Sequence, residues 1–387
     1  METRKLFFID PQSYNNLATY DRSLLEGFKK YSVYFFGNTL YKEYIPDNVA
    51  FFPIFSYSTK KSNFTKVISY VQSLRYIMKA IIREKPSCVH IQWLRLWEID
   101  FWFIKWLQRR DIKVIFTAHN LLPHDSGDKY RQKYLKYYRT IDHIIVHTSD
   151  TKHKLITDFE ICPDKISVIR HGILKSTLDG KSISNCQLKL KSELNIENQL
   201  VFSSLGFQSL YKGTDNIIEA WTSSKQLYDN PNLILLIAGK NVNVDYSKIS
   251  HIKNVRIIDD MVTDVEFSAL VNLSSVVLLP YRTISQSGLL LTAISQNKPV
   301  IVSNAGGLSE PLEIAKIGWN IGPSSANELS MLMIHLSENP DEILAVTNDY
   351  QGFETIKTVY SWEHIATETE RVYETLYTSK NNLKSTN

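Results

Sequence analysis

Short apolar segments alternate along the chain with longer stretches of mixed polarity. In the first half, five such segments are interpreted as strands: KLFFID, SCVHIQW, KVIFTA, HIIVHT and KISVI. Five more follow in the second half: LVFSSLG, NLILLIAG, NVRII, SVVLLP and KPVIV. Because helix-length segments separate these strands, the pattern predicts parallel sheets covered by helices on both faces. Two such series predict an α/β protein with two Rossmann-like domains.

A stretch of small and polar residues indicates where the two domains meet. Residues 173–187, ILKSTLDGKSISNCQ, are interpreted as a linker between the two series of strands. We therefore expect one domain over residues 1–175 and a second over residues 188–360. A length of 387 residues suits two domains of roughly 150 to 200 residues each.

Charged residues are divided unevenly between these domains. Residues 1–175 contain 28 Lys and Arg against 17 Asp and Glu, whereas the rest of the chain contains 16 against 23. One interpretation is an ordinary solvated basic face. The other is a first domain that faces an anionic surface, such as the inner face of a membrane. The sequence leaves both open.

The composition is that of a globular protein, with 43% hydrophobic and 22% charged residues. No apolar run is long enough to span a bilayer, and the polar opening METRKLFFID does not resemble a signal peptide. The cysteines Cys88, Cys162 and Cys186 form neither a disulfide nor a metal-binding pattern. We therefore expect a cytoplasmic protein without a metal, another cofactor or a nucleic-acid partner.

Polar residues gather where the predicted strands end. Ligands of open parallel sheets bind in the crevice beyond the carboxyl ends of the strands. In the first domain that position holds TAHNLLPH, with His119, Asn120 and His124. In the second domain it holds LGFQSLYKG, AGK, PYRTISQSG and NAGGLSE. These segments are the candidate binding loops.

The segment PYRTISQSGLLLTAIS, residues 280–295, points to an anion. An apolar strand gives way here to hydroxyl side chains and a glycine before a helix begins. Free backbone N–H groups at a helix start attract anions, so we expect a phosphate site. A plain helix cap is the alternative, but it would need a single capping residue. The expected phosphate site comprises Arg282, Ser285, Gln286, Ser287 and Gly288.

Six motifs in order resemble the family 4 glycosyltransferases, also called glycosyltransferase group 1, of the GT-B fold. They are TAHNLLPH, VIRHGI, LGFQSLYKG, LILLIAGK, LLPYRTISQSGLLLTAISQNKPVIVSNAGGLSEPL and YSWEHIATETERVYETLY. The resemblance covers nearly the whole chain, to about Tyr377. It implies two Rossmann-like domains that face each other across a cleft, the first for the acceptor and the second for a nucleotide sugar. It also implies a C-terminal helix, about 361–378, that crosses back to the N-terminal domain.

The resemblance assigns donor-binding roles in the second domain. Gly206 would let the backbone approach the donor, and Lys212 would reach its diphosphate. The family often has an arginine where this chain has Phe207, and it often has two glutamates where this chain has Ile284 and Thr292. The segment between these two positions would then hold the diphosphate through backbone N–H groups and hydroxyls, without a carboxylate. Further donor contacts are expected from Gly306, Gly307 and Glu310, unless Glu310 only caps the next helix.

In the first domain the resemblance places His119 beside the transferred sugar. There it would donate a hydrogen bond and help to position the reacting carbon, although a lone histidine is more often structural. Asn120 and His124 would contact the acceptor. If the sugar is transferred with inversion, His124 or Asp125 would act as the base for the acceptor hydroxyl.

An aromatic segment, LWEIDFWFIKWLQRR, bears on where the protein works. Its aromatic residues lie in one helix-length run that ends in Arg109 and Arg110. Aromatic side chains with flanking cations suit a membrane interface. A core helix of the first domain is the alternative. Both interpretations can hold if one face of the helix packs in the core and the other faces lipid.

The sequence therefore predicts a glycosyltransferase that moves a sugar from a UDP- or GDP-sugar to a lipid-linked glycan. The resemblance implies capsule, exopolysaccharide or O-antigen assembly, with retention of configuration. The expected location is the cytoplasm or, peripherally, the cytoplasmic face of the inner membrane. An inverting GT-B enzyme is one alternative, and a nucleotide-sugar-binding protein without catalysis is another. A hydrolytic epimerase of the same fold fits less well, because the strand-end motifs supply few carboxylates.

Overall fold

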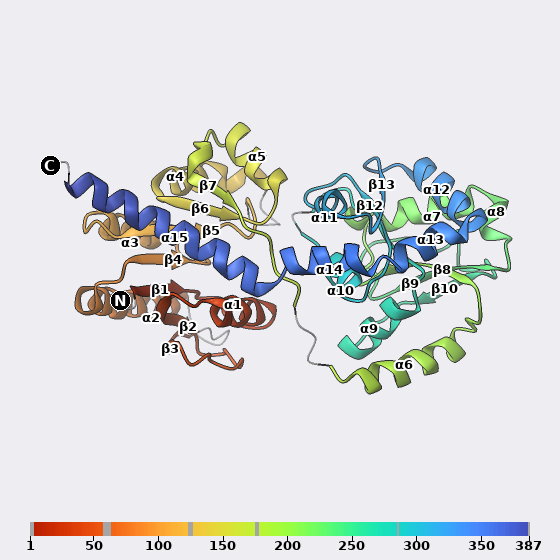
Figure 1. Cartoon of the computed structure of the whole chain (residues 1–387), viewed down its shortest axis with the longest axis horizontal. Helices are drawn as coiled ribbons and strands as arrows, with labels where there is room; N and C mark the ends of the chain where they lie inside the picture. The colour runs from red at the N-terminus through yellow and green to blue at the C-terminus, as the bar shows by residue number, and fades with distance from the viewer. Residues whose placement is uncertain (1–3, 57–62, 123–126, 175–177, 285, 386–387) are drawn as a thin grey trace. The chain divides into compact units, whose positions relative to one another are not determined.

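The computed structural model divides the chain into two compact units (Figure 1). It describes residues 4–56, 63–122, 127–174, 178–284 and 286–385. The first unit combines residues 1–172 with residues 360–387, and the second spans residues 173–359. Each unit is built on one sheet whose strands all pair in parallel. The predicted α/β fold is confirmed.

The first unit contains a seven-stranded sheet of order β3-β2-β1-β4-β5-β6-β7. Its strands are β1 Arg4–Ile9, β2 Tyr31–Asn38, β3 Val49–Phe55, β4 Cys88–Ile91, β5 Lys113–Thr117, β6 His143–Val146 and β7 Ile166–Val168. Its helices are α1 Asn16–Gly27, α2 Asn63–Glu84, α3 Trp97–Gln108, α4 Arg131–Thr140, α5 Ser149–Thr157 and α15 Trp362–Ser385. The 3-10 turns Gly127–Tyr130 and Pro163–Lys165 lie between these helices and strands.

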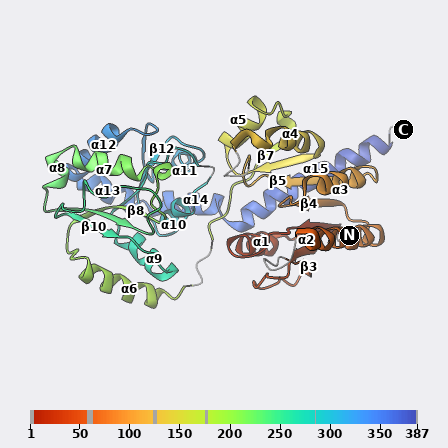
Figure 2. The ribbon, with the colours of Figure 1, turned by 180° about the vertical axis from the view of Figure 1, so that it is seen from behind.

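Both faces of this sheet are buried, as successive residues of β1 show. Phe7 belongs to a core that includes residues of α2, α3, α4 and α5, whereas its neighbours Leu6 and Phe8 belong to a core that includes residues of α1 and α15. Side chains of a strand point alternately to opposite faces, so continuous apolar strands require cover on both sides. Figure 1 shows α15 in front of the sheet, and Figure 2 shows it behind.

The C-terminal helix completes the first unit, as the resemblance implied. Helix α15 packs against α1, and its Trp362, Ile365, Ala366 and Tyr373 are buried in the core that it shares with β1 and β2. The helices approach closely at Gly27, where a Cβ atom would lie 2.5 Å from the Cβ of Ala366. Residues more than three hundred positions apart thus form one hydrophobic core.

The second unit contains a six-stranded sheet of order β10-β9-β8-β11-β12-β13. Its strands are β8 Leu200–Leu205, β9 Leu233–Ala238, β10 Val255–Ile258, β11 Val276–Leu279, β12 Val300–Ser303 and β13 Gly318–Ile321. Its first helices are α6 Gly180–Glu193, α7 Thr214–Thr222, α8 Lys225–Tyr228, α9 Asp264–Leu273 and α10 Gly288–Ser295. They are followed by α11 Glu310–Ile314, α12 Ala326–Glu338, α13 Pro340–Thr347 and α14 Tyr350–Val359, and the 3-10 turn η3 spans Leu210–Lys212.

The interpretation of residues 173–187 as a linker is wrong for its second half. Residues 180–187 are the first two turns of α6, which packs against α9. Asp179 begins the helix, because its side chain accepts hydrogen bonds from the N–H groups of Lys181 and Ser182. The less exposed positions are Ile183, Cys186, Gln187 and Leu190, a spacing that gives a helix one inward face.

Three strands were not among the sequence predictions, namely β2, β3 and β13. Strand β2 is rich in aromatic residues, and β3 contains Pro53, which is compatible with its place at the edge of the sheet. Within the described ranges, no helix has the length and apolarity to cross a membrane.

Replacing Trp362 with alanine is expected to destabilise the first unit. Trp362 is 4% exposed and packs edge-on against Tyr20, with ring centroids 5.1 Å apart. The cavity should lower the free energy of unfolding by about 3–5 kcal/mol. Trp102→Ala is the matched control, because Trp102 on α3 is 50% exposed, and its cost should stay below about 1 kcal/mol. Urea unfolding of the full chain measures the free energy of unfolding of each variant. Equal losses in the two variants would contradict the packing role of Trp362.

Candidate functional site

The loop after β8 brings a glycine and a lysine together at the carboxyl edge of the second sheet. Gly206 has φ +86°, a conformation that side chains rarely adopt, and a Cβ atom there would lie 3.1 Å from Lys212 Nζ. Lys212 ends the turn η3, and its Nζ also lies 5.6 Å from the centre of the buried Tyr281 ring. The structure therefore brings together two predicted donor-site residues that are six positions apart.

The ammonium of Lys212 is poorly solvated. Burial lowers the pKa of Lys212 from its ordinary value to about 8. In the described parts of the chain, no carboxylate lies within ion-pair distance of this side chain. A partly desolvated cation with no counter-ion among the described residues favours an anionic ligand, because the ligand would restore the missing charge interaction.

Two residues of the same loop were missed by the sequence predictions. Gln208 is fully buried and holds the loop in place: its amide nitrogen donates to the carbonyl of Gly206 at 2.7 Å, and its oxygen accepts from Thr214 at 2.9 Å. Ser209 is 2% exposed, and its hydroxyl has no partner among the described residues. A buried hydroxyl without a partner is unusual, so Ser209 marks a polar position that a ligand can satisfy.

Arg282 has a protein partner in this structure. Its guanidinium donates to both carboxylate oxygens of Asp215, at 2.7 and 2.6 Å, and to the side-chain oxygen of Asn216 at 2.9 Å. It also donates to the carbonyl of Leu210. This bidentate pair joins the loop after β11 to the start of α7, so the guanidinium fixes the loop and its charge is largely balanced by Asp215.

The helix start predicted as a phosphate cradle is present at Gly288. Ser287 is the N-cap of α10, and its hydroxyl accepts a hydrogen bond from the N–H of Leu290. Gly288 is exposed, and a Cβ atom there would meet nothing within 4 Å. Gln286 is half-buried, and Ser285 lies outside the described residues. The hydroxyl of Ser287 therefore caps the helix, whereas the space beside Gly288 is open.

The loop after β12 contains the last predicted donor contacts. Gly306 has φ +57°, and its missing side chain makes room for the carbonyl of Ile284 from the loop after β11. This close approach explains Gly306 by the packing of two loops, whereas the sequence interpretation had a ligand there. Gly307 is half-buried, and Glu310 is buried as the first residue of α11. Ser309, not Glu310, is the N-cap of that helix.

In the first unit, His119 is part of a chain of hydrogen-bonded side chains. Its Nε2 lies 2.8 Å from the amide of Gln92, and its Nδ1 lies 3.2 Å from His147 Nε2. Its ring stacks on Trp93, with centroids 5.2 Å apart and planes within 3° of parallel. Protein groups thus occupy both ring nitrogens, and a hydrogen bond from His119 to a substrate would have to replace one of them.

Burial keeps the histidines of this chain neutral. It lowers the pKa of His119 well below its usual value and lowers the pKa of His147 as well, and His147 adds to the shift of His119. For His90, which follows Gln92 in the chain of contacts, burial lowers the pKa to about 3. Each ring therefore carries one proton at neutral pH.

The neutral rings determine the direction of the hydrogen bonds at His147 and His119. His147 Nδ1 donates to the carbonyl of Ile169 at 2.9 Å, so its Nε2 accepts from His119 Nδ1. His119 Nε2 then needs a donor, and we assign the amide nitrogen of Gln92 to that position. The Gln92 oxygen then faces His90 Nε2, which also lies 2.7 Å from the hydroxyl of Thr117, and His90 Nδ1 lies 2.6 Å from the hydroxyl of Tyr373. The opposite amide orientation would require a buried imidazolium.

The remaining predictions for the first unit are distributed as follows. Asn120 is half-buried directly after His119, at the carboxyl edge of the sheet. His124 and Asp125 lie outside the described residues. No cluster of three or more metal-ligating side chains is found where the structure is described. Gln92 and His147, the partners of His119, were missed because neither belongs to a local motif.

Comparisons with known proteins were made with this geometry in hand. Residues 35–174 match the model of Glycosyltransferase Family 4, and residues 187–350 match that of Glycosyl transferases group 1. No curated protein sequence matches the chain at a significant level. Many solved structures do match, so the fold is a common one.

Three of these structures illustrate the likeness. A glycosyltransferase from Rickettsia africae has a TM-score of 0.66 at 15% identity, covering 97% of this chain and 99% of that chain. Sucrose-phosphate synthase from Thermosynechococcus elongatus has a TM-score of 0.66 at 16% identity, covering 97% and 100%. HepE from Anabaena, in complex with UDP, has a TM-score of 0.65 at 12% identity, covering 97% and 100%. At these identities the likeness establishes the GT-B fold.

Gly288→Val is expected to weaken binding of inorganic diphosphate at this helix start by tenfold or more. The added side chain would fill the open space beside the helix start and block the approach of a diphosphate to the N–H groups of α10. Calorimetric titration with inorganic diphosphate measures the effect. Ser287→Ala is the comparison variant: it should destabilise the helix by about 1 kcal/mol while keeping the backbone donors. Unchanged diphosphate affinity in the folded Gly288→Val protein would exclude this helix start from the site.

Proposed function

The chain belongs to the group 1 glycosyltransferases, and on that premise we propose that it transfers a sugar from a UDP- or GDP-sugar to a lipid-linked glycan. The proposed setting is the assembly of a capsule, exopolysaccharide or O-antigen. The family models support the transferase activity in both halves of the chain. The UDP complex of the structurally similar HepE supports a nucleotide-sugar donor.

The desolvated ammonium of Lys212 is the observation that carries this proposal. When the glycosidic bond of the donor breaks, the leaving nucleoside diphosphate gains negative charge. A fixed cation that has no carboxylate partner among the described residues stabilises that charge more than the charge of the intact donor. The backbone N–H groups at Gly288 would supply further donors to the same diphosphate. Together they make a carboxylate-free diphosphate site.

Retention of configuration is the proposed stereochemical outcome, as the resemblance implies. An inverting reaction would need a base for the acceptor hydroxyl. The bases expected for inversion, His124 and Asp125, lie outside the described residues. His119 is a poor base in this structure, because both ring nitrogens have partners and burial lowers its pKa well below the usual value. A neutral imidazole adds no positive charge beside a sugar carbon that develops positive charge in the transition state.

Membrane association is proposed from α3 and its neighbour α4. Four side chains of the aromatic segment belong to the core, namely Phe103, Ile104, Trp106 and Leu107. Trp102 is exposed, and so are the cations Lys105 and Arg109. From α4, the exposed Lys136 lies 4.3 Å from the centre of the Phe101 ring. An exposed tryptophan among cations suits the interface of an anionic membrane.

The pH dependence of donor binding tests the role of Lys212. The pKa of this lysine is lowered to about 8, so its ammonium is present below pH 8 and is lost as the pH rises through that value. UDP affinity should therefore fall between pH 7 and pH 9, by up to about tenfold per pH unit. Lys212→Arg should bind UDP with little change over this range, because arginine keeps its charge. Calorimetric titrations at several pH values measure both.

Lys212→Ala should lower both UDP affinity and the rate of transfer at pH 7 by tenfold or more, because a charged hydrogen bond is worth roughly 1.5–3 kcal/mol. Lys225→Ala, on an exposed lysine of α8, is the control and should behave as wild type. Normal UDP binding by a folded Lys212→Ala protein would contradict the proposed donor site.

Binding to vesicles tests the membrane proposal. The full chain should bind vesicles that contain phosphatidylglycerol at low salt, and binding should weaken as the salt concentration rises, because screening reduces the attraction of exposed cations. Trp102→Ala should weaken this binding several-fold, whereas Tyr350→Ala, at an exposed aromatic of the second unit, should not. Co-sedimentation measures each protein. Equal binding by the Trp102 and Tyr350 variants would remove α3 from the interface.

A further inference from the structure

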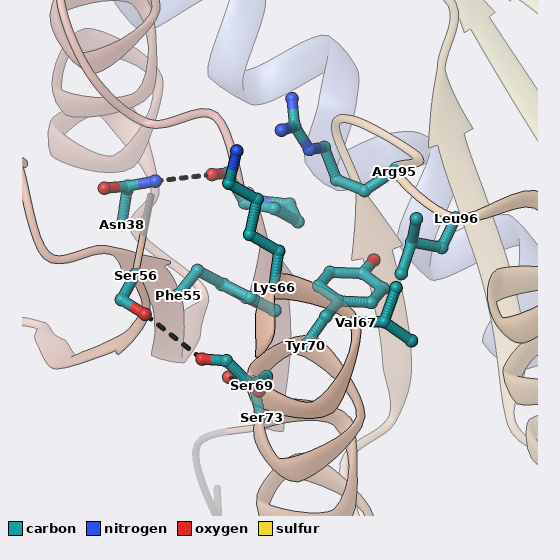
Figure 3. Close-up of a pocket in the computed structure, with 11 residues that line it drawn as sticks. Asn38, Phe55, Ser56, Lys66, Val67, Ser69, Tyr70, Ser73, Arg95 and Leu96 are labelled. Atoms are coloured by element: carbon teal, nitrogen blue, oxygen red, sulfur yellow. Dashed lines mark hydrogen bonds between the residues drawn. The ribbon is translucent and has the colours of Figure 1, made fainter. Parts of the chain in front are cut away.

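A pocket of about 250 Å³ lies at the carboxyl edge of the first sheet (Figure 3). Pro11 follows β1, Asn38 and Phe55 end β2 and β3, and Arg95 follows β4, so four neighbouring strands open into it. The first turns of α2 form the opposite wall. The pocket is distinct from the His119 chain, but it lies close to that chain in sequence, because Arg95 is three residues after Gln92.

Two cationic side chains from different elements line this pocket. Lys66 comes from α2, and Arg95 comes from the loop between β4 and α3. In Figure 3 the charged ends of both side chains lie on the same side of the rings of Phe55 and Tyr70. Cations that converge on one cavity from two elements favour a ligand with a compact negative charge.

The acids near this pocket are already engaged. Asp100 accepts hydrogen bonds from the Tyr70 hydroxyl at 2.6 Å and from the N–H groups of Arg95 and Leu96 at 2.6 and 2.7 Å. Burial raises the pKa of Asp100 to about 6, and it does the same for Asp10 at the end of β1. The positive charge of Arg95 has the opposite effect and lowers the pKa of both carboxyl groups. Arg95 is thus held at the pocket, and Lys66 brings a second positive charge.

The rest of the wall is apolar and continues outside the pocket. Phe55, Val67 and Leu96 line the cavity. On α2, Phe64, Val67 and Ile68 are 75%, 37% and 42% exposed, and their spacing of three and four residues puts them on one face of the helix. Val67 belongs both to this exposed stripe and to the pocket wall. An apolar surface therefore leads from the cationic pocket to solvent.

We propose that this pocket binds a phosphate or diphosphate carried on a hydrocarbon chain. Lys66 and Arg95 hold the anion, and the stripe of Phe64, Val67 and Ile68 covers the first carbons of the chain. The proposal rests on the proposed function and names the site at which the lipid-linked acceptor is held. A neutral glycan acceptor would use neither the two cations nor the exposed stripe.

Farnesyl diphosphate is a suitable probe, because it combines a diphosphate with a short hydrocarbon chain. The full chain should bind it in calorimetric titrations, and Lys66→Ala should weaken this binding by tenfold or more. Lys79→Ala, on an exposed lysine farther along α2, is the matched control and should bind as wild type. Arg95→Gln is a second variant with the same expected loss. Thermal unfolding checks that each variant is folded. If Arg95→Gln does not fold, the result for Lys66→Ala alone decides the proposal.

Two further probes separate the parts of the ligand. Inorganic diphosphate and farnesol, titrated into Lys212→Ala to exclude the donor site, should each bind at least tenfold more weakly than farnesyl diphosphate. If inorganic diphosphate binds as tightly as farnesyl diphosphate, the hydrocarbon part of the proposed ligand is wrong. If farnesol binds as tightly as farnesyl diphosphate, the anionic part is wrong. Wild-type affinity for farnesyl diphosphate in Lys66→Ala and Arg95→Gln would overturn the site itself.

The donor site is measured independently in the same variants. Lys66→Ala should bind UDP as wild type, because Lys66 and Lys212 belong to different units. Failure of the acceptor proposal thus appears in the farnesyl diphosphate titrations with UDP binding intact. Failure of the proposed function appears instead as UDP binding that does not depend on Lys212.

Discussion

The packing of α15 into the first unit is the interaction on which the arrangement around His119 depends. Trp362 lies against Tyr20 and His171, and Tyr20 in turn meets the ring of His119 at 4.9 Å between centroids. Farther along the helix, the Tyr373 hydroxyl lies 2.6 Å from His90 Nδ1 and so ends the chain of hydrogen bonds that orients His119. The helix that completes the hydrophobic core therefore also holds one end of that chain. A change in its packing would act on the site without touching a ligand.

Burial has opposite consequences for the two candidate sites. It lowers the pKa of Lys212 to about 8, which leaves the ammonium charged at neutral pH. It lowers the pKa of His119 well below the usual value, which leaves the imidazole neutral. The same desolvation thus produces a cation in the second unit and an uncharged, hydrogen-bonded ring in the first. On the proposed function, the cation would lie beside the departing diphosphate and the neutral ring beside the reacting sugar carbon.

The sequence predicted the strands with continuous apolar runs, such as KLFFID and NLILLIAG, because burial on both faces leaves little room for polar residues. It did not predict β2, whose segment YSVYFFGN mixes aromatic and polar residues, or β3, whose segment VAFFPIF contains a proline. Helix α6 was missed because its one inward face is short and mixed in composition.

The predicted site residues were those in local motifs, such as Lys212 and Gly288. Gln92, His147 and Ser209 were not, because their importance comes from partners distant in sequence or from burial. The two cations of the pocket, Lys66 and Arg95, belong to this second group, since nothing in the sequence places α2 opposite the end of β4.

The presence of isoleucine rather than glutamate at position 284 has a structural counterpart. Ile284 occupies one position where related sequences often have a glutamate, and its carbonyl fills the space left by the missing side chain of Gly306. Arg282, two residues earlier, is fixed by Asp215 and Asn216. Residues 282–284 of the loop after β11 are therefore held by protein contacts and need no ligand to keep their position. On the proposed function, a donor site built on backbone N–H groups would recognise the diphosphate, which is common to all nucleotide sugars, more strongly than the hydroxyl groups that distinguish one sugar from another. Selection of the proposed acceptor would then depend on the first unit, where side chains line the pocket.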